Sequence, residues 1–421
     1  MTFHRTIQIL SLALFLFLLF AAAVSLPGSL PVDLFLRLDP SLILVTALSS
    51  RILLAAFLPA AIVLILSPLF GRLFCGYFCP MGTTLDGAER LFKTHRKERA
   101  RIEPFRRLKY LVLAFLIGGS LLGVSFAFLA SPLSLITRFY GLLIYPLLAF
   151  IMDGSLSLIR PFAEWLDINT LIFAQIKTPR FATQIFILAF FASLIALARL
   201  SPRFWCRTLC PSGALLALFS RNPMIRRRVS EDCTDCGKCV KACPMNAIGP
   251  DEPGLTRHEE CLLCRTCERV CPENAVSFPF RMKVRAGGTP RFSITRRQLL
   301  TTGLTGAATA VVGLTGLHSL YGKPGPGQVA PEGLIRPPGS LPEMAFLSRC
   351  VRCGECMAAC PTNTLQPLWF KAGFMGMFSP VLIPRRGFCN PECHVCGSVC
   401  PTGAILKLTE QERIWLSLIH I

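Results

Sequence analysis

Histidine is scarce in this sequence. The 421 residues include six, at positions 4, 95, 258, 318, 394 and 420. A haem held inside membrane helices needs facing histidines within apolar spans, and the apolar stretches described below supply no such pair. The Cys-x2-Cys-His run that attaches haem covalently is absent as well. These absences argue against haem as a cofactor.

Charged residues are also few. They make up 16% of the chain, whereas hydrophobic residues make up 52%, and the mean hydropathy is +0.53. This composition excludes an ordinary soluble protein and predicts helices in lipid. Uncharged stretches of about 18 residues or more are long enough to cross a bilayer core. Five are present: Ile7–Leu26, Ile52–Phe70, Tyr110–Ala130, Phe181–Ala198 and Leu299–Leu317.

A sixth apolar stretch, Leu133–Met152, contains Arg138. A charge at mid-membrane costs several kcal/mol unless it is paired or faces a cavity, so this stretch is ambiguous. We expect four core helices, with residues 131–178 forming an irregular loop on the outer side.

Acidic residues are outnumbered, 24 against 44 Lys and Arg, which gives a formal net charge of +20. The basic residues cluster beside the apolar spans and form no basic face with interleaved aromatics, which argues against nucleic-acid binding. Residues 71–109 contain ten Lys and Arg and residues 199–228 contain seven, so both segments are predicted to be cytoplasmic. The predicted loop over residues 27–51 holds only Arg37 and Arg51, balanced by Asp33 and Asp39, so it fits the outer side of the membrane. Because no small-residue cleavage site precedes Pro27, we interpret Ile7–Leu26 as an anchor and not as a cleaved signal peptide.

Cysteine is abundant, with twenty residues in tight groups whose spacing suits metal ligands better than disulfides. Two runs follow the second basic segment: Cys233-x2-Cys236-x2-Cys239-x3-Cys243-Pro and Cys261-x2-Cys264-x2-Cys267-x3-Cys271-Pro. This is the bacterial two-cluster ferredoxin pattern, in which the fourth cysteine of each run ligates the other cluster. One [4Fe–4S] cluster is therefore predicted on Cys233, Cys236, Cys239 and Cys271, and another on Cys261, Cys264, Cys267 and Cys243. Structural zinc is the weaker alternative, because zinc sites supply two pairs of ligands.

Two further runs lie near the end of the chain: Cys350-x2-Cys353-x2-Cys356-x3-Cys360-Pro and Cys389-x3-Cys393-x2-Cys396-x3-Cys400-Pro. The same crossover predicts one cluster on Cys350, Cys353, Cys356 and Cys400, and one on Cys389, Cys393, Cys396 and Cys360. The extra residue in the first gap of the last run leaves the place of Cys389 open. If Cys389 does not reach, that site holds a three-iron cluster or uses another ligand such as His394.

The remaining four cysteines form two matching motifs, Cys75-Gly-Tyr-Phe-Cys79-Pro80 and Cys206-Arg-Thr-Leu-Cys210-Pro211. Each motif follows an apolar span and an arginine, Arg72 or Arg203, and precedes a small-residue turn. The spacing predicts that the two thiols of each motif lie on the same side of one helix. If the motifs face each other, the four thiolates hold a further cluster or metal at the membrane surface, or act as a redox dithiol pair. Otherwise they are structural helix ends with free thiols.

Paired arginines, Arg296 and Arg297, precede a mildly apolar stretch, which is the pattern read by twin-arginine export. A plain basic flank of a membrane helix is the alternative. Export would place the last two cysteine runs outside the membrane, whereas the first two stay in the cytoplasm. The Pro/Gly-rich residues that follow predict an extended linker. Residues 416–421 resemble translated adapter read-through, so we expect a truncated or non-native tail.

The predicted fold class is an α-helical membrane domain plus two small α+β bacterial-type dicluster ferredoxin domains. The predicted domains are a transmembrane helical domain (1–222) with both Cys-x3-Cys-Pro motifs, a ferredoxin domain (229–280), a twin-arginine-like signal or transmembrane helix (293–320), a linker (321–345), a second ferredoxin domain (346–410) and the tail (411–421).

The membrane part carries Arg72-Leu-Phe-Cys75-Gly-Tyr-Phe-Cys79-Pro80 and Arg203-Phe-Trp-Cys206-x3-Cys210-Pro211, followed by two ferredoxin runs. In these motifs it resembles NapH, the quinol dehydrogenase membrane component of periplasmic nitrate reductase systems. The same membrane core occurs in NosR and in the CcoG/RdxA group. Residues from 293 onward are similar to NapG, the exported iron–sulfur partner of NapH. The chain departs from these families in joining both parts, in the Cys389 spacing, and in having fewer cluster motifs than NapG.

The resemblance implies a multi-pass protein of the bacterial cytoplasmic membrane that passes electrons from menaquinol, through four [4Fe–4S] clusters, to a periplasmic or membrane redox partner. It implies electron transfer without bond-making chemistry of the chain's own. Two other functions stay open. One is an electron-donating assembly or maturation factor of the CcoG/RdxA or NosR type, and the other is a membrane-tethered ferredoxin without quinone contact.

Overall fold

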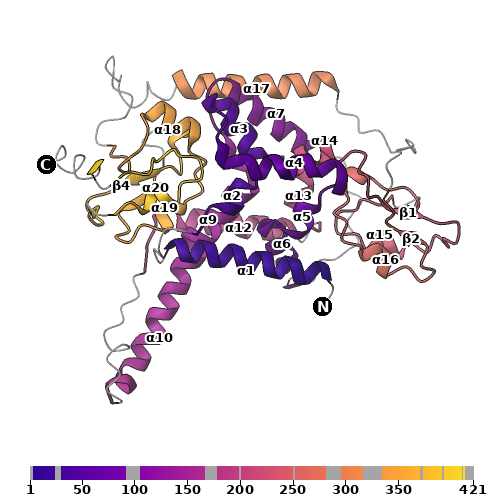
Figure 1. Ribbon diagram of the computed structural model, residues 1–421, viewed down its shortest axis with the longest axis horizontal. Helices are drawn as coiled ribbons and strands as arrows, with labels where there is room; N and C mark the ends of the chain where they lie inside the picture. Colours follow the sequence, from indigo (N-terminus) through magenta and orange to yellow (C-terminus); the bar gives the residue numbers. More distant parts are fainter. Residues whose placement is uncertain are drawn as a thin grey trace. The chain divides into compact units, whose positions relative to one another are not determined.

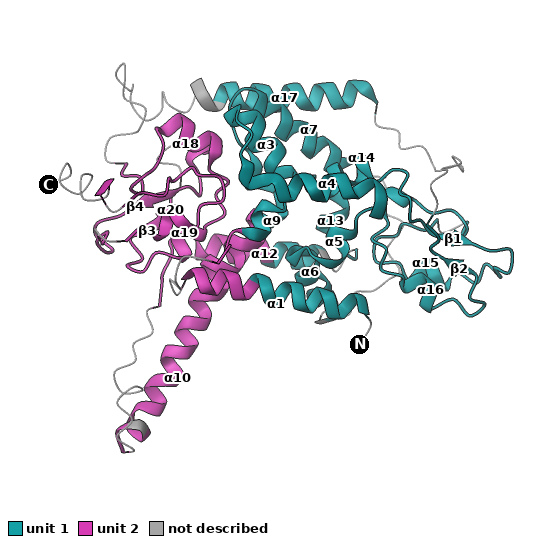
Figure 2. Ribbon diagram, viewed as in Figure 1, with its two compact units in different colours: residues 1–15, 34–133, 192–316 teal, residues 16–33, 134–191, 317–421 magenta. Residues whose placement is uncertain are grey.

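The computed structural model describes residues 3–23, 30–91, 105–165, 178–198, 201–249, 252–280, 295–315, 334–369, 373–390, 393–409 and 411–412 (Figure 1). The chain divides into two compact units (Figure 2). Unit 1 comprises residues 1–15, 34–133 and 192–316, and unit 2 comprises residues 16–33, 134–191 and 317–421. Helices α1 (Phe3–Ala23) and α12 (Gln184–Ala198) contribute residues to both units. Each unit contains two of the four ferredoxin-type cysteine runs.

Helix α7 (Leu108–Leu121) packs against both α3 (Pro40–Ser50) and α14 (Pro211–Phe219) in unit 1, and α14 also contacts α3. Their apolar contact buries Tyr110, Leu113, Ala214, Leu215 and Ala217. Shorter elements complete this helical part: α2 (Leu34–Arg37), η1 (Ala55–Phe57), α4 (Leu58–Phe70) and α8 (Ala127–Ala130).

Helix α3 begins at a strong N-terminal signal. Asp39 accepts a hydrogen bond from the Ser41 backbone N–H at 2.9 Å, and Pro40 takes the first helical position, where a missing N–H costs nothing. The expectation that residues 27–51 form an outer loop is therefore wrong for residues 40–50, which are helical and packed in the core. From the sequence alone, Asp39 was treated only as a charge in a loop. In the structure, Asp39 is instead the N-cap of this helix.

The two Cys-x3-Cys-Pro motifs fold alike. In the first, the short helix α5 (Leu73–Tyr77) ends and α6 (Pro80–Leu91) begins at the proline. In the second, α13 (Phe204–Thr208) ends and α14 begins at Pro211. The prediction of one helix carrying both thiols of a motif is wrong, because proline lacks an N–H and its ring clashes within a continuing helix. The second cysteine of each motif lies at the break.

Helix α17 (Arg296–Thr315) lies along α7 (Figure 1). A capping box starts it: Thr295 Oγ1 accepts from the Gln298 N–H, and Gln298 Oε1 accepts from the Thr295 N–H, both at 3.3 Å. A Cβ atom on Gly118 would lie 1.9 Å from the Gly303 carbonyl oxygen, so only glycine permits this approach of the two backbones. The paired arginines therefore form the first turn of a helix packed within unit 1.

The cysteine-rich part of unit 1 contains two short antiparallel strands, β1 (Arg228–Val229) and β2 (Val276–Ser277), with Val229 opposite Val276. Between them lie α15 (Lys238–Ala242), the 3-10 turn η4 (His258–Glu260) and α16 (Thr266–Arg269). The third cysteine of each run opens a short helix, Cys239 in α15 and Cys267 in α16. These two thiols share a small core with Ile248 and Val276.

In unit 2, the elements α9 (Pro132–Phe139), η3 (Tyr140–Ile144, a π-helical turn) and α10 (Tyr145–Trp165) form a continuous helix. The expectation of an irregular loop over 131–178 is therefore wrong for residues 132–165, and residues 166–177 lie outside the described part. Arg138 does not interrupt the helix, because its guanidinium stacks over the Phe378 ring at 4.8 Å and is buried.

The second cysteine-rich segment contains α18 (Glu343–Arg349), α19 (Glu355–Ala358), β3 (Leu365–Pro367), η5 (Phe374–Gly376), β4 (Pro380–Leu382) and α20 (Val395–Ser398). Strands β3 and β4 are antiparallel, with Gln366 opposite Val381. Residues 334–345 are not an extended linker as expected. The Leu382 N–H donates to the Ile335 carbonyl at 2.9 Å and the Leu406 N–H to the Gly339 carbonyl at 2.8 Å, so this stretch packs on the ferredoxin segment.

Two described helices are long and apolar enough to cross a membrane, Phe3–Ala23 and Pro132–Phe162, and three shorter apolar helices are Pro40–Ser50, Ala55–Phe70 and Gln184–Leu197. The predicted span Tyr110–Ala130 is interrupted, because α7 ends at Leu121 and Gly123 takes a left-handed conformation with φ of 84°.

Candidate functional site

The thiols of the two Cys-x3-Cys-Pro motifs lie near one another in unit 1. Cys79, Cys206 and Cys210 are buried and Cys75 is half-buried. Burial raises the pKa of the Cys79 thiol, and the neighbouring Cys75 and Cys206 raise it further. Burial also raises the pKa of Cys210, followed in size by the effects of Cys206 and Cys75. The four thiols thus form one electrostatically coupled group, named here the four-thiol group.

Each arginine that precedes a motif reaches across to the other motif. Arg203 donates from Nη1 to the Cys75 carbonyl oxygen at 3.2 Å, and its Nη1 would lie 3.6 Å from a Cβ on Gly82. Arg72, in turn, covers Gly213, where a Cβ would lie 2.5 Å from Arg72 Nη2. Both arginines are fully buried. This exchange joins the two motifs into one structure and explains the glycine at position 213, whereas at Gly82 the nearest atom to an added Cβ is the Cys75 carbonyl oxygen, at 3.1 Å.

A fully buried carboxylate, Asp39, also borders the second motif. It accepts hydrogen bonds from Ser212 Oγ at 2.5 Å, from Ser131 Oγ at 2.7 Å and from Ser41 Oγ at 2.9 Å. These donors compensate the cost of burying the charge. Sequence reasoning assigned Asp39 to a loop, although the order Asp-Pro-Ser is a recognisable helix-start signal.

Four thiols from two different runs line a small cavity of about 20 Å³ in unit 1: Cys243, Cys261, Cys264 and Cys267. A second cavity of about 20 Å³ is lined by the other four: Cys233, Cys236, Cys239 and Cys271. In each cavity, three thiols come from one run and the fourth from the other run. No three His, Cys, Asp or Glu side chains in the described parts of the chain converge as ligands of a single ion would. The thiols therefore surround a space and do not meet at its centre.

The loops around these cavities have a repeated backbone shape that fits an anionic iron–sulfur group. The residues on both sides of the second cysteine are left-handed in the first three runs, with φ between 48° and 88°: Asp235 and Gly237, Leu263 and Arg265, Arg352 and Gly354. Alternation of this kind turns successive backbone N–H groups toward one centre, which forms an anion-binding concavity. The Ala247 N–H already points at Cys243 Sγ, at 3.3 Å. Thiolates and inward N–H donors are what a [4Fe–4S] group requires.

The last run departs from this pattern. Its residue after the second cysteine, His394, has φ of −124° instead of a left-handed value. Cys389 is exposed, and no other ferredoxin-type cysteine besides Cys236 is so classed in the described chain. The irregular spacing of this run therefore coincides with an irregular backbone.

The thiols of unit 2 also group across runs. Burial raises the pKa of Cys356, and the neighbouring thiols of Cys353, Cys350 and Cys400 raise it further. Burial raises the pKa of Cys389 as well, followed by the effects of Cys393 and Cys360. Each group thus combines members of one run with the fourth cysteine of the other.

The ferredoxin part of unit 1 is docked directly on the first Cys-x3-Cys-Pro motif. Gly76 makes this possible, since a Cβ there would lie 2.8 Å from the Leu262 carbonyl oxygen. The neighbouring Tyr77 donates its hydroxyl to the Leu263 carbonyl at 3.0 Å. Cys75 and Cys243 both pack against the buried cluster of Met245, Ala247 and Leu262. The four-thiol group and one cluster-type cavity therefore share an apolar contact.

A buried charge network reinforces this contact. Glu260, next to Cys261, accepts a hydrogen bond from Arg72 Nη1 at 2.6 Å and another from Lys109 Nζ. Arg106 adds hydrogen bonds to the carbonyl oxygens of Met245 and Asn246. Sequence reasoning missed Glu260 and Lys109, because a lone acidic residue beside a cysteine run gives no signal of its distant partners.

The histidines lie in varied places. His4 stacks edge-on against Tyr77 with ring centroids 4.6 Å apart, and His258 starts η4. His394 precedes α20 in the last run. The other three, at positions 95, 318 and 420, lie outside the described residues.

Comparison with known families accounts for the cysteines. Residues 52–98, 183–230 and 395–417 match the family described as 4Fe-4S binding domain, and residues 232–275 and 349–404 match the 4Fe-4S dicluster domain. The first two of these stretches contain the four-thiol group. The chain therefore carries ferredoxin-type 4Fe–4S domains, as the cysteine runs predict.

Several known proteins are similar to parts of the chain. The Escherichia coli K12 protein named "Putative electron transport protein YccM" is 29% identical over 223 residues, which are 52% of this chain and 53% of YccM. The methylamine utilization ferredoxin-type protein MauM of Methylorubrum extorquens is 39% identical over 118 residues, 27% of this chain and 50% of MauM. The ferredoxin-type protein NapG of Escherichia coli K12 is 42% identical over 72 residues, 17% of this chain and 31% of NapG. The chain thus spans about half the length of YccM and MauM, and no solved structure matches it.

Proposed function

We propose that this iron–sulfur, ferredoxin-type electron-transfer protein is a membrane-bound relay that carries electrons from the quinol pool to a periplasmic reductase, as a NapG–NapH-like pair would. Menaquinol is the proposed donor. The fusion of a NapH-like membrane part with a NapG-like ferredoxin would hold both ends of the relay in one chain.

The proposed ligands of four [4Fe–4S] clusters are the sixteen cysteines of the ferredoxin runs, in the crosswise sets that the crossover rule gives. The two thiol-lined cavities of unit 1 and the left-handed loops around them support these sets. Each cluster, when bound, would accept and release one electron. The chain's own residues hold the thiolates in place and turn N–H groups toward them.

The observation that carries the relay is the docking of α5 on the second ferredoxin run. Cys75, in α5, and Cys243, a proposed cluster ligand, pack on the same buried apolar residues. Electron transfer requires short distances between redox groups, and this contact provides one between the four-thiol group and a cluster cavity. The match of residues 52–98 and 183–230 to a 4Fe-4S binding family supports a further cluster at Cys75, Cys79, Cys206 and Cys210.

The proposed topology places residues 229–280 in the cytoplasm and residues 346–410 in the periplasm. The grouping of chain segments supports it. The first ferredoxin shares unit 1 with both Cys-x3-Cys-Pro motifs, which basic flanks assign to the cytoplasm. The second ferredoxin shares unit 2 with residues 134–191, which include most of the segment 131–178 predicted to lie on the outer side. Arg180, for example, accepts a hydrogen bond through its carbonyl oxygen from Arg386 Nη1 at 2.8 Å.

Two measurements test this function together. Alkaline phosphatase and green fluorescent protein would be fused after Phe280 and after Leu408, and anaerobically purified full-length protein would be mixed with a reduced menaquinol analogue. We expect fluorescence from the Phe280 fusion, phosphatase activity from the Leu408 fusion, and bleaching of the cluster absorbance by the quinol.

Two results would contradict the relay: a Leu408 fusion that fluoresces without phosphatase activity, and clusters that only dithionite reduces. Together they would favour a ferredoxin tethered to the membrane on the cytoplasmic side. An iron content below about 12 per chain after full reconstitution would contradict four [4Fe–4S] clusters.

A further inference from the structure

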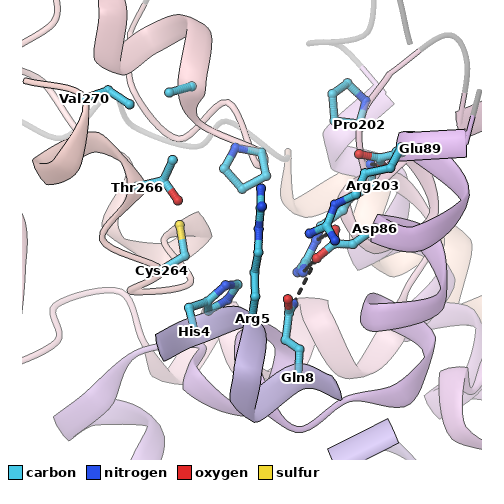
Figure 3. Close-up of a pocket in the computed structure, with 13 residues that line it drawn as sticks. His4, Arg5, Gln8, Asp86, Glu89, Pro202, Arg203, Cys264, Thr266 and Val270 are labelled. Carbon is cyan, nitrogen blue, oxygen red and sulfur yellow. Dashed lines mark hydrogen bonds and ion pairs between the residues drawn. The ribbon is translucent and has the colours of Figure 1, made fainter. Parts of the chain in front are cut away.

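A cavity of about 550 Å³ in unit 1 is separate from the small thiol-lined cavities (Figure 3). Its wall is built by the first turns of α1, the end of α6, the turn before α13 and the ferredoxin segment. Its polar lining includes His4, Gln8, Asp86, Glu89 and Arg203. A cavity of this size accommodates a ring-containing ligand or head group.

One wall of the cavity belongs to the electron-transfer machinery. Cys264, a proposed ligand of the cluster site shared with Cys243, lines the cavity together with Thr266. In Figure 3, the Cys264 sulfur lies on the ferredoxin side with His4 below it, the carboxylates lie on the opposite side, and the Arg5 side chain extends upward between the two in this view. A molecule in this cavity would therefore lie beside a ligand of a one-electron acceptor.

The opposite wall holds two carboxylates in contrasting environments. Asp86 is saturated, because it accepts from Arg203 Nε at 2.6 Å, from Arg203 Nη2 at 2.5 Å and from Gln8 Nε2 at 2.9 Å. Burial opposes ionisation of Asp86, but Arg203 outweighs it and lowers the pKa of the carboxyl. In the described part of the chain, Glu89 accepts one hydrogen bond, which comes from the Arg203 backbone N–H. Burial dominates there and raises its pKa to about 7.

A histidine faces the cavity as well, beside the arginines Arg5, Arg90 and Arg203 that also line it. His4 Nε2 is buried and has no hydrogen-bond partner in the described part of the chain. Sites that move protons typically contain two titratable groups whose pKa values are pushed apart by their different environments. Arg203 lowers the pKa of Asp86, and Asp86 holds Arg203 in place, which leaves Glu89 and His4, whose own pKa burial and Arg203 lower, as the groups with capacity to accept protons.

Helix α1 supplies three lining residues, His4, Arg5 and Gln8, and exposes the apolar side chains of Phe3, Ile9 and Leu10 on its other faces. The helix that closes the cavity is therefore itself amphipathic.

We propose that a hydroquinone is oxidised in this cavity, with Glu89 and His4 accepting its two phenolic protons. This proposal rests on the proposed relay function. Both O–H bonds break, the two C–O bonds become C=O, and the ring gives up two electrons. Two one-electron acceptors, the [4Fe–4S] clusters proposed in residues 229–280, are each reduced once, with Cys264 nearest the ring. Asp86 and Gln8 are positioning residues.

The test uses the full-length, cluster-loaded protein and the quinone-site inhibitor heptyl-hydroxyquinoline N-oxide as the binding probe. Inhibitor affinity is measured by fluorescence quenching, and cluster reduction by a hydroquinone is followed by stopped-flow absorbance. For Glu89→Gln, which keeps the shape of the side chain, we expect a change in affinity below about threefold and at least about a 100-fold slower reduction, the range seen for lost general bases. Glu89→Trp, which fills the cavity, should abolish inhibitor binding.

Glu259→Gln is the matched control. Glu259 is another half-buried carboxylate of unit 1 whose pKa is raised by burial, but it does not line the cavity. This variant should behave like the wild type, and dithionite should reduce the clusters equally in all variants.

Wild-type rates in Glu89→Gln, or unchanged inhibitor binding in Glu89→Trp, would overturn the assignment of this cavity while the relay stands. A wild-type protein that is reduced by NADH and not by hydroquinone, with Glu89→Gln slowing that reaction, would overturn the substrate class. If hydroquinone reduces no cluster and the inhibitor does not bind, the relay itself is refuted and this site with it.

Discussion

Arg203 donates a hydrogen bond from Nη1 to the carbonyl oxygen of Cys75 at 3.2 Å, although 128 residues separate the two in sequence. The same guanidinium forms a two-pronged ion pair with Asp86. The residue that introduces the second motif thus fixes the backbone of the first.

Replacement of Arg203 by lysine should destabilise the protein. A lysine cannot contact both carboxylate oxygens and the Cys75 carbonyl, because it has one compact ammonium in place of the planar fork. Lysine keeps the positive charge, so the loss is that of hydrogen bonds to a charged group, each worth about 1.5–3 kcal/mol. Thermal unfolding in detergent should therefore shift clearly downward, and iron bound per chain should fall.

Arg265→Lys serves as the control, because the Arg265–Glu268 pair is exposed and 3.7 Å long. Pairs of this kind contribute about 0–1 kcal/mol. Equal shifts for the two variants would contradict the crossing role of Arg203.

Substitution of Glu260 by glutamine should loosen the first ferredoxin from the helices. The change leaves Arg72 and Lys109 buried without a counter-charge, which costs about 3–5 kcal/mol. Hydrogen exchange at η4 and α5 should accelerate in Glu260→Gln. The further change Lys109→Met should restore part of the protection, whereas additive losses would argue against a shared network.

The raised pKa of Glu89, about 7, predicts a pH effect on stability. A carboxyl whose folded pKa exceeds its unfolded value stabilises the fold at low pH and loses that contribution as the pH rises through the folded pKa. Unfolding free energy should therefore decline between about pH 4.5 and pH 7, by up to about 3 kcal/mol. Glu89→Gln should remove this decline and be more stable than the wild type at alkaline pH, as chemical denaturation can measure.

Enlarging Gly306 should separate α17 from α7. A Cβ at this position would lie 2.1 Å from the Phe115 carbonyl oxygen, so Gly306→Leu forces the backbones apart, at a cost of about 1–3 kcal/mol. Gly87→Ala is the control, because nothing lies within 4 Å of its added Cβ and alanine favours the helix. A melting temperature unaffected by Gly306→Leu would contradict the close packing of these helices.

A serine replacement should show whether Cys389 is a ligand, with Cys393→Ser as the reference for a lost ligand. If Cys389 is a ligand at the irregular end of its run, Cys389→Ser should lower the iron content by about one atom, since one corner of a [4Fe–4S] cluster is lost. The three-iron product has a paramagnetic resonance signal in the oxidised protein. Cys393→Ser should lower the iron content by the same amount, because it also leaves three thiolates. Unchanged iron and spectra in Cys389→Ser would favour another ligand such as His394.

The ferredoxin domains could be predicted from sequence because cluster ligation imposes fixed local spacings. The prediction of 4Fe–4S domains is confirmed by the family matches, whereas the crosswise ligand sets stay predictions that shared cavities support. The helix breaks at Pro80 and Pro211 were also predictable from proline chemistry, but the Cys-x3-Cys spacing was read as one helical turn.

The tertiary part of the site could not be predicted in the same way. Arg72 and Arg203 each serve the opposite motif, and Glu260 collects two cations from distant helices. Such partners depend on how helices pack, and no local spacing encodes them. Asp39 was predictable in part. Its capping of α3 depends on neighbouring residues, whereas its hydrogen bond with Ser212 depends on how the helices pack.

The exchange of arginines between the motifs also has a consequence for synthesis. The first motif is complete in the nascent chain once residue 82 has left the ribosome, yet Arg203 and Gly213 are added more than a hundred residues later. The four-thiol group is therefore assembled only after translation of both Cys-x3-Cys-Pro motifs, on a chain at least 213 residues long.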